Sequence, residues 1–464
     1  MSTTEGLIDY ICSTQYEDLP SEAVAAAKRL IMNTFCAILC GSGAEGVKEL
    51  ADLVKDWGGK EEGTVFLYDT KVPAHEAVLV NATMARALDF DEFNFQTGLH
   101  TGGTVVPVAL AAAETFGKVD GRKLIAAVVS GAEVMSRMRL VPDYCIGVSG
   151  WAGEVYAAFG GAITAGKLLG LPREKMVNAL GLAYSQAAGN SQPIYDGSLA
   201  TRLQQGLSAR AGFLSAILAA HGLTGSQNFL EGKAGFYPVY YRGMDYDISR
   251  LLDSIGEKYE FMNIATKPYP CCGFLIAPIE NVLDIMHQNN MKQRDISKVV
   301  VRINQQMYNT VCVPPETKYR PKTAADAMFS LPYAVGTAIL NGDVLVGDFS
   351  VDAITDPERL KIADKVEIKV DEDINQESKE LHCAFSPHEL AIETGSGKHF
   401  SQKLYYAKGF PQKPMTMEDF TEKAKKCSHY AVKHFTDSRI EELKERVERL
   451  EKQNDIGYFT RLLL

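Results

Sequence analysis

Alanine and glycine recur every three or four positions through long helical stretches of the first 265 residues. Examples are SEAVAAAKRLIMNTFCAILCG (21–41), FGGAITAGKLLGL (159–171) and LSARAGFLSAILAAHGLTG (207–225). Small side chains at this spacing let helices approach one another closely, and glycine is a common helix stop. This part of the chain is therefore predicted to form an all-α bundle with buried central helices.

The pattern changes near residue 266. The segments ISKVVVRINQQ (296–306) and ADKVEIKVDEDI (363–374) alternate β-branched residues, as half-buried strands do, and 389–409 is predicted to form two strands across a glycine-rich turn. Apolar helices are expected at about 275–288 and 323–341, and the residues after the last predicted strand are again predicted to be helical. We predict a mainly α fold, with a large all-α domain from both chain ends (1–265 and 410–464) and an inserted, smaller α+β domain (266–409).

Composition limits the partners and the compartment. The net charge is −10 without a basic stripe, which disfavours nucleic acid. No run of about 18 uncharged apolar residues predicts a membrane span, and the acidic start of the chain is unlike a signal peptide. Nine scattered cysteines fit a reducing cytoplasm, and the absence of CxxC or HxxxH spacing predicts no metal site. A small molecule or a protein is the expected partner.

The segment ALDFDEFNFQTGLHTGGTVVPVALA (87–111) places Asp89, Asp91 and His100 around a glycine-rich stretch that leads into a helix near Thr104. The start of such a helix offers free N–H groups, which are suited to a carboxylate. A histidine beside it can move protons near neutral pH. The alternative is that Asp89 caps a turn and that His100 is a hydrogen-bonded structural residue.

The stretch KPYPCCGFLIAP (267–278) holds Lys267 in a backbone stiffened by two prolines. A lysine held in this way suits a substrate carboxylate, although a surface lysine is the alternative. The adjacent cysteines Cys271 and Cys272 point in different directions, so a shared metal ion or a mutual disulfide is disfavoured. We expect the two thiols to pack in the core or to line a pocket.

Three further side chains are candidates. Tyr333 lies near the start of an apolar helix in SLPYAVGTAILNG (330–342), either as a hydrogen-bond donor or acid, or as a core tyrosine with a satisfied hydroxyl. Arg202 and Arg210 bracket the beginning of a helix in GSLATRLQQGLSARAG (197–212), where they either attract anions or lie on the surface. The glycine-rich GVSGWAG (147–153) is a candidate pocket lip.

These motifs, in this order, resemble the MmgE/PrpD family, which includes 2-methylcitrate dehydratase, cis-aconitate decarboxylase and iminodisuccinate epimerase. The likeness runs from about residue 5 to 430 and rests on six stretches: ALDFDE with a histidine about ten residues on, AGKLLGL, GLSARAGFLSAILAAHGLTG with LEGKAGF, KPYPCCG, DAMFSLPYAVGTAILNG and YAKGFPQKPMT.

The resemblance implies a homodimer with an active site in a cleft between the two domains and no metal or organic cofactor. Family members act on small di- or tricarboxylates by proton transfer at a carbon next to a carboxylate, coupled to loss of water, loss of carbon dioxide or inversion. Carried onto this chain, it implies His100 as the proton-transfer group, with Asp89 orienting it or binding substrate. Lys267 and Arg202 would grip carboxylates, and Tyr333 would act as donor or acid.

The chain also departs from the family pattern. Phe93 stands where decarboxylase-type members carry a threonine, and His100 comes one residue late. The family's second-domain histidine falls on Cys272, a first-domain lysine falls on Thr201 beside Arg202, and a loop histidine falls on Ala152. Fewer cations disfavour citrate-like triacids, and the apolar surface of Phe93 suits a less charged or partly apolar acid. Cys272 would replace the histidine as acid or base if Lys267 lowered the pKa of its thiol.

The sequence thus predicts a cytoplasmic, cofactor-independent lyase, a dehydratase or decarboxylase, acting on a small di- or tricarboxylate or a related organic acid. One alternative is an epimerase or isomerase of a small carboxylate. The other is a family member that still binds a small acid and has lost the chemistry, since several family residues are missing.

Overall fold

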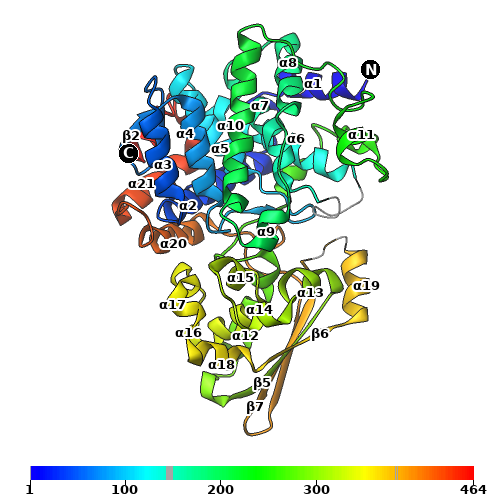
Figure 1. Cartoon of the computed structure of the whole chain (residues 1–464), viewed down its shortest axis with the longest axis vertical. Coiled ribbons are helices and arrows are strands. Elements are labelled where there is room, and N and C mark those ends of the chain that lie inside the picture. The colour runs from blue at the N-terminus through cyan, green and yellow to red at the C-terminus, as the bar shows by residue number, and fades with distance from the viewer. Residues whose placement is uncertain (1, 143–149, 382, 384, 464) are drawn as a thin grey trace. The chain divides into compact units, whose positions relative to one another are not determined.

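The computed structural model describes residues 2–142, 150–381, 383 and 385–463. The chain divides into two compact units, unit 1 (1–264 with 416–464) and unit 2 (265–415). The structure is mainly helical with little sheet (Figure 1), as the sequence predicted. Residues 410–415, which were expected to rejoin the helical domain, lie in unit 2. There Gly409 accepts from the Thr266 backbone N–H (2.8 Å) and donates to the Lys413 carbonyl (2.8 Å).

Unit 1 is a helical bundle with two minor sheets. The sheets pair β1 (Gly63–Val65) with β2 (Thr70–Val72), and β3 (Phe93–Asn94) with β4 (Ile264–Ala265). Its helices are α1 (Thr3–Ser13), α2 (Ser21–Gly41), α3 (Val47–Trp57), α4 (Ala74–Arg86), α5 (Gly102–Thr115), α6 (Gly121–Leu140), α7 (Ala157–Leu168), α8 (Arg173–Tyr184), α9 (Gln192–Asp196), α10 (Ala200–Ala220), α11 (Phe236–Tyr240), α20 (Met417–Ser428), α21 (Asp437–Glu448) and α22 (Gly457–Leu462).

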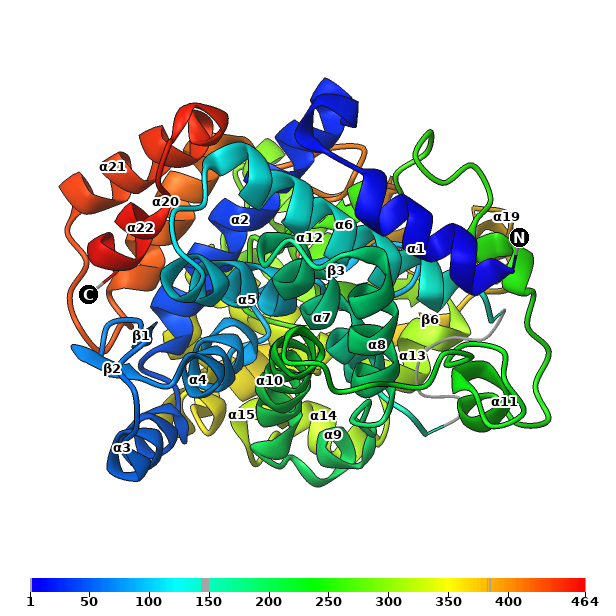
Figure 2. The ribbon, with the colours of Figure 1, turned by 90° about the horizontal axis from the view of Figure 1, so that it is seen from above.

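Helix α7 lies among α5, α6, α8 and α10 (Figure 2), and glycines explain how closely α7 and α10 pack. A Cβ atom on Gly212 would overlap the Ala158 carbonyl and lie 2.8 Å from the Ala162 nitrogen. On the facing helix, a Cβ on Gly161 would lie 3.0 Å from the Ala209 carbonyl oxygen. The small-residue spacing of the sequence is therefore used for helix contact.

The C-terminal helices return to unit 1. Helices α20 and α21 pack on α2, and α22 packs on α5. The buried face of α20 carries Phe420, Ala424 and Cys427 at helical spacing. Among the described residues, one helix, α2, is long and apolar enough to cross a membrane, but 78% of its most apolar window is buried inside the structure, as in the core helix of a soluble protein.

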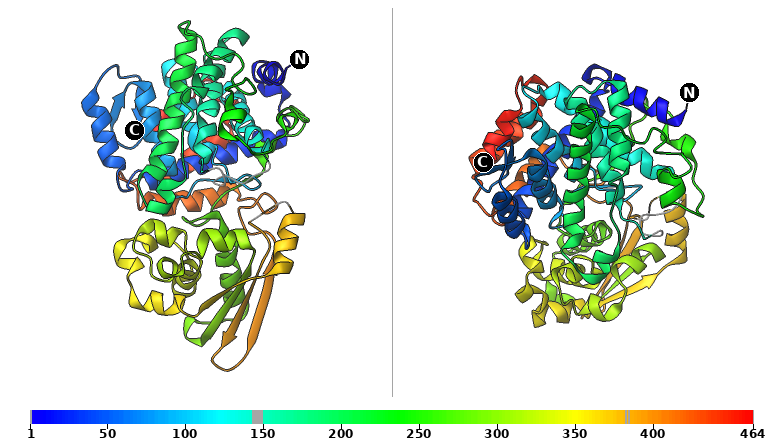
Figure 3. Two further views of the ribbon diagram at one scale, coloured as in Figure 1. Left: turned by 45° about the vertical axis from the view of Figure 1, so that its right-hand side comes forward. Right: turned by 45° about the horizontal axis from the view of Figure 1, so that its top comes forward.

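Unit 2 contains a four-stranded sheet in the order β6-β5-β7-β8. Strands β5 (Ile296–Ile303) and β6 (Val366–Val370) are parallel, and β7 (His388–Thr394) forms an antiparallel hairpin with β8 (His399–Leu404) whose tip extends beyond the helices of this unit (Figure 3). The strands match the three predicted segments. The helices are α12 (Gly273–Gln288), α13 (Gln305–Val311), α14 (Pro315–Tyr319), α15 (Ala324–Met328), α16 (Leu331–Asn341), α17 (Val351–Ile354), α18 (Pro357–Ala363) and α19 (Glu372–Glu380).

The single helix predicted over 323–341 is divided into α15 and α16. Ser330 begins the second helix, since its hydroxyl accepts from the Tyr333 backbone N–H at 3.2 Å. Pro332 follows in the first turn, where proline is tolerated because its missing N–H would have no helical partner. The serine and proline together explain the break.

Candidate functional site

The end of α4 and the turn after it bring together three charged side chains of unit 1, those of Arg86, Asp89 and Asp91. Asp89 occupies the left-handed region with φ of 50°, a conformation that is uncommon outside glycine and enriched in aspartate. Its carboxylate pairs with Arg86, the last residue of α4, and Arg86 Nη1 also lies 3.4 Å from Asp91 Oδ1. Arg86 and both aspartates are buried. Burial alone lowers the pKa of Arg86, but the charges of Asp91, Asp89 and Glu154 outweigh burial and raise it.

His100 belongs to the same cluster through Asp91. Its Nδ1 lies 2.9 Å from Asp91 Oδ2, and 17% of the histidine side chain is exposed. The two atoms lie at ion-pair distance without the alignment of a hydrogen bond, so the carboxylate acts on the ring through its charge and leaves Nε2 for proton exchange. The acid that contacts His100 is therefore Asp91, whereas Asp89, to which the sequence assigned the orienting role, pairs with Arg86.

Glu92 occupies the helix start that was expected to receive a substrate carboxylate. Its Oε1 accepts from the backbone N–H groups of Thr101 (2.9 Å) and Gly102 (2.5 Å) at the beginning of α5. Burial and the neighbouring charge of Asp91 raise the pKa of Glu92. The expectation of a free carboxylate seat at this helix is wrong, because a carboxylate of the chain itself fills it.

Lys423 reaches this cluster from α20. It is buried, and its Nζ donates to Asn33 Oδ1 (2.8 Å) and to the Phe90 carbonyl (2.7 Å) in the middle of the ALDFDE motif. Burial lowers the pKa of Lys423. Asn33 in turn donates to Glu92 at 3.5 Å. Helix α20 thus supports the backbone that carries the two aspartates.

The other predicted residues of unit 1 make local contacts. Arg202 and Arg210 both lie within α10, where Arg202 Nη1 donates to the Glu45 carbonyl (2.9 Å) and Arg210 pairs with Glu76 (2.5 Å). Thr201 is half-buried in the first turn of the same helix, and its backbone N–H donates to Ser198. Phe93 is buried in β3.

Three predicted residues lie in unit 2. Lys267 is 1% exposed, so the surface-lysine alternative is wrong. Cys272 is buried at the start of α12, and its backbone N–H donates to the Met328 carbonyl at 3.0 Å. The neighbouring Cys271 is fully buried.

Tyr333 has the environment of a core tyrosine. It is fully buried, its hydroxyl donates to the Asp348 carbonyl, and it accepts from Arg359 Nη1 at 3.3 Å. Burial raises the pKa of Tyr333 to about 12. Because the single phenolic proton is donated within unit 2, this geometry matches the core alternative, and the role of Tyr333 as a donor or acid toward substrate stays a prediction.

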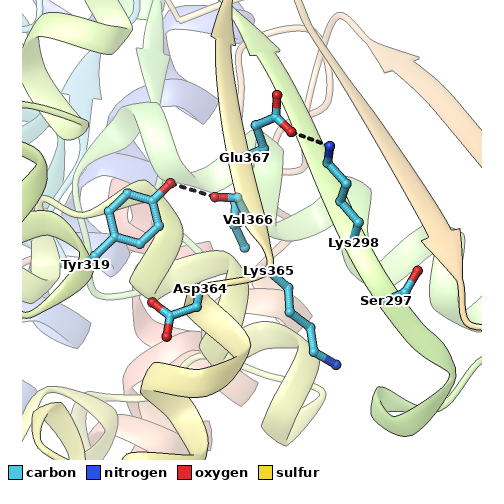
Figure 4. A pocket seen from close by; sticks show the side chains of 7 residues that line it. All are labelled: Ser297, Lys298, Tyr319, Asp364, Lys365, Val366 and Glu367. Atoms are coloured by element: carbon cyan, nitrogen blue, oxygen red, sulfur yellow. Dashed lines mark hydrogen bonds and ion pairs between the residues drawn. The ribbon is translucent and has the colours of Figure 1, made fainter.

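Two surface cavities among the described residues are lined by none of the predicted site residues. One, of about 460 Å³ on unit 2, is lined by residues 297–298, 319 and 364–367 (Figure 4). Its polar groups have partners in the chain, since Lys298 pairs with Glu367 and the Tyr319 hydroxyl donates to the Val366 carbonyl at 2.6 Å. The other, of about 330 Å³ on unit 1, lies between the ends of α5 and α10 and is lined by His75, Phe116, Phe213 and His221 among others. The candidate lip 147–153 falls partly outside the described residues.

Two family models match the chain. The MmgE/PrpD N-terminal domain matches residues 5–249, and the MmgE/PrpD C-terminal domain matches residues 269–449. The chain belongs to the MmgE/PrpD family. The C-terminal family model includes residues 416–449, which pack within unit 1 in this structure.

Curated relatives cover almost the whole chain. A cis-aconitate decarboxylase of Aspergillus terreus is 26% identical over 96% of this chain and 93% of the relative. Cis-aconitate decarboxylases of Mus musculus and Homo sapiens are each 25% identical over all of this chain and over 93% and 94% of the relatives. Together with the family membership, these relatives identify the protein as an enzyme, a lyase.

Sequence reasoning missed Arg86, Glu92 and Lys423 of this MmgE/PrpD cluster, and it named Asp91 without its contact to His100. One-dimensional spacing does not say which carboxylate of the motif turns toward the histidine. Arg86 was one of many charged residues in a segment predicted to be helical, and Lys423 follows His100 by more than 300 residues. The buried face of α20 gave no signal for Lys423, because lysines on amphipathic helices are usually solvated.

Proposed function

We propose that this MmgE/PrpD protein is a lyase that removes carbon dioxide or water from a small di- or tricarboxylate or a related organic acid, with His100 as the proton-transfer group. The observation that carries the proposal is the contact between Asp91 and Nδ1 of a partly exposed His100. The decarboxylase activity of relatives that match nearly the full length of the chain supports the reaction class.

Asp91 is proposed as a positioning residue. Held by Arg86 on one oxygen and placed against His100 with the other, it fixes the ring and stabilises the imidazolium that forms on proton uptake. In a decarboxylation, the bond between carbon and carboxylate breaks, the electron pair stays on carbon, and His100 delivers a proton there. In a dehydration, His100 removes the proton next to the carboxylate, and hydroxide leaves as water with a second proton.

Both courses place negative charge next to a carboxylate, and cationic groups lower the energy of such a state. The resemblance assigns this role to Lys267 and Arg202. Phe93 and Thr201, which stand where family members carry other residues, are proposed to contact the substrate. The reduced number of cations relative to the family supports a substrate with less charge than a triacid. Cys272, at the start of α12, is proposed as a second acid or base, on the condition that Lys267 lowers the pKa of its thiol.

The test is turnover of a panel of di- and tricarboxylates and partly apolar acids, followed by proton NMR in deuterium oxide. His100→Ala should lower turnover by about two to four powers of ten, because that is the usual contribution of a general acid or base. His221→Ala, an exposed histidine after α10, is the matched control and should keep full activity. Near-normal turnover by His100→Ala would refute the assignment.

The same assay tests Asp91. Asp91→Asn should lower kcat and change its pH profile, since His100 loses the carboxylate that lies against its ring. Inversion of the substrate without loss of carbon dioxide or water would identify an epimerase. Binding of an acid without deuterium exchange would identify a protein that has lost the chemistry. Either result would contradict the lyase proposal.

A further inference from the structure

Arg139, in the last turn of α6, is a buried arginine outside the His100 cluster. It is 5% exposed, and its Nε is fully buried without a hydrogen-bond partner. Within the part of the chain that the structure describes, no carboxylate pairs with it. The buried Arg137, on the same turn, has a full set of acceptors in contrast. Its guanidinium donates to Glu133 at 2.5 Å and to the carbonyls of Asp253 and Lys258, each at 2.6 Å.

Three buried tyrosines form a group beside the end of α6, which carries Arg139. Tyr156 follows Gly153 in a 3-10 turn, and Tyr237 and Tyr241 belong to the α11 region. Burial raises the pKa of all three phenols, and the positive charge of Arg139 acts against this in each case. Geometry places the group at the last turn of α6, because the Tyr237 hydroxyl bonds to the carbonyl of Met138, the residue before Arg139. The Tyr237 ring lies 6.1 Å from that of Tyr241, whose hydroxyl bonds to that of Tyr156.

The three tyrosine hydroxyls carry three protons, and the hydrogen bonds between described residues use two of them. Tyr237 donates to the Met138 carbonyl at 3.0 Å. Tyr156 and Tyr241 hydrogen-bond to each other, which uses one of their two protons. For the second proton, the described residues supply no acceptor. A phenolic O–H and the Arg139 Nε–H are thus both buried without an acceptor at one place in unit 1.

Buried donors without an acceptor lower the stability of the folded state unless a ligand supplies the acceptor. Burying a charge without a partner is strongly unfavourable. The negative end of the α6 dipole offsets only part of this cost. We propose that Arg139 and the Tyr156–Tyr241 pair form a binding site for a small oxyanion, a carboxylate or a phosphate group, made of residues other than those around His100. The competing partner is Asp143, which lies outside the described residues.

The test is thermal unfolding of the full chain at constant ionic strength, in chloride and with added inorganic phosphate or acetate. A ligand of the folded state raises the unfolding temperature in a saturable way. Phosphate, acetate or both should do so for the wild type, and the arm that responds identifies the class of anion. Arg139→Met, which keeps side-chain length and removes the charge, should weaken the response at least tenfold and unfold in chloride no earlier than the wild type.

The controls keep the proposal falsifiable. Arg122→Met removes an exposed arginine of the same helix and should leave the anion response unchanged. Tyr241→Phe removes one hydroxyl and should weaken the response. Retention of the response in Arg139→Met would overturn the proposal. Equal destabilisation by Arg139→Met and Asp143→Asn in chloride would also overturn it, because it would show an internal ion pair. Neither readout depends on turnover, so this proposal and the lyase proposal fail separately.

Discussion

Replacing Arg86 with methionine should destabilise unit 1 strongly. Arg86 Nη1 faces carboxylate oxygens of both Asp89 and Asp91, and all three side chains are less than a tenth exposed. Methionine fills much of the same volume but leaves two buried carboxylates without their cation. Removing one partner of a buried ion pair costs about 3–5 kcal/mol. At about 2.1 cal/mol/K of unfolding entropy per residue, a unit of about 310 residues shifts by about 1.5 °C per kcal/mol, so the unfolding temperature should fall by roughly 5–8 °C.

Differential scanning calorimetry or urea unfolding, with a double-mutant cycle, measures this effect. Asp89→Asn in the Arg86→Met background removes one of the two buried carboxylates that face Arg86, so it should recover part of the loss. We expect an interaction energy of about 0.5–3 kcal/mol in the cycle. Arg122→Met, which breaks only an exposed pair with Glu17, should change stability by less than about 1 kcal/mol. A loss below about 1 kcal/mol for Arg86→Met, or a double variant less stable than the single one, would refute this reasoning.

Two further predictions concern pH and helix packing. Burial lowers the pKa of His388 from 6.5 to about 3, so the folded state keeps the ring neutral while the unfolded chain binds a proton below pH 6.5. Stability is therefore complete above pH 6.5 and falls by about 1.4 kcal/mol per pH unit toward pH 3. His388→Asn should flatten this dependence in urea unfolding at pH 6.5 and 4.5, and equal slopes would contradict the assignment. Gly212→Ala should cost about 1–3 kcal/mol, because the new methyl overlaps the Ala158 carbonyl. Gly103→Ala, whose methyl would meet Ala85 at 3.6 Å, should be tolerated in the same assay, and equal losses would argue against close helix contact as the cause.

Much of the local structure was readable because its signals are local. The alternation in ISKVVVRINQQ predicted β5, and the glycine-rich turn predicted the β7–β8 hairpin. The break between α15 and α16 was missed, because an apolar period continues through 323–341 and only the capping contact of Ser330 shows where the first helix stops.

In the candidate site, too, contacts close in the sequence were predictable and the others were not. Asp89, Asp91 and His100 stand within twelve residues of one another, so their association followed from chain connectivity. Which carboxylate faces the imidazole depends on the left-handed turn at Asp89, which turns that side chain toward Arg86. For Tyr333, the competing acceptor is the Asp348 carbonyl, 15 residues farther along the chain.

The sequence by itself determined the helical character of the chain, the positions of its strands, the family and the motif that carries His100, because these depend on periodicity and on residues close together in the chain. Only the tertiary structure decided that Asp91 holds His100, that Glu92 fills the start of α5, and that Lys423 from α20 supports the motif. The free energy of a buried charge depends on partners brought from any distance along the chain, and sequence spacing does not contain those distances.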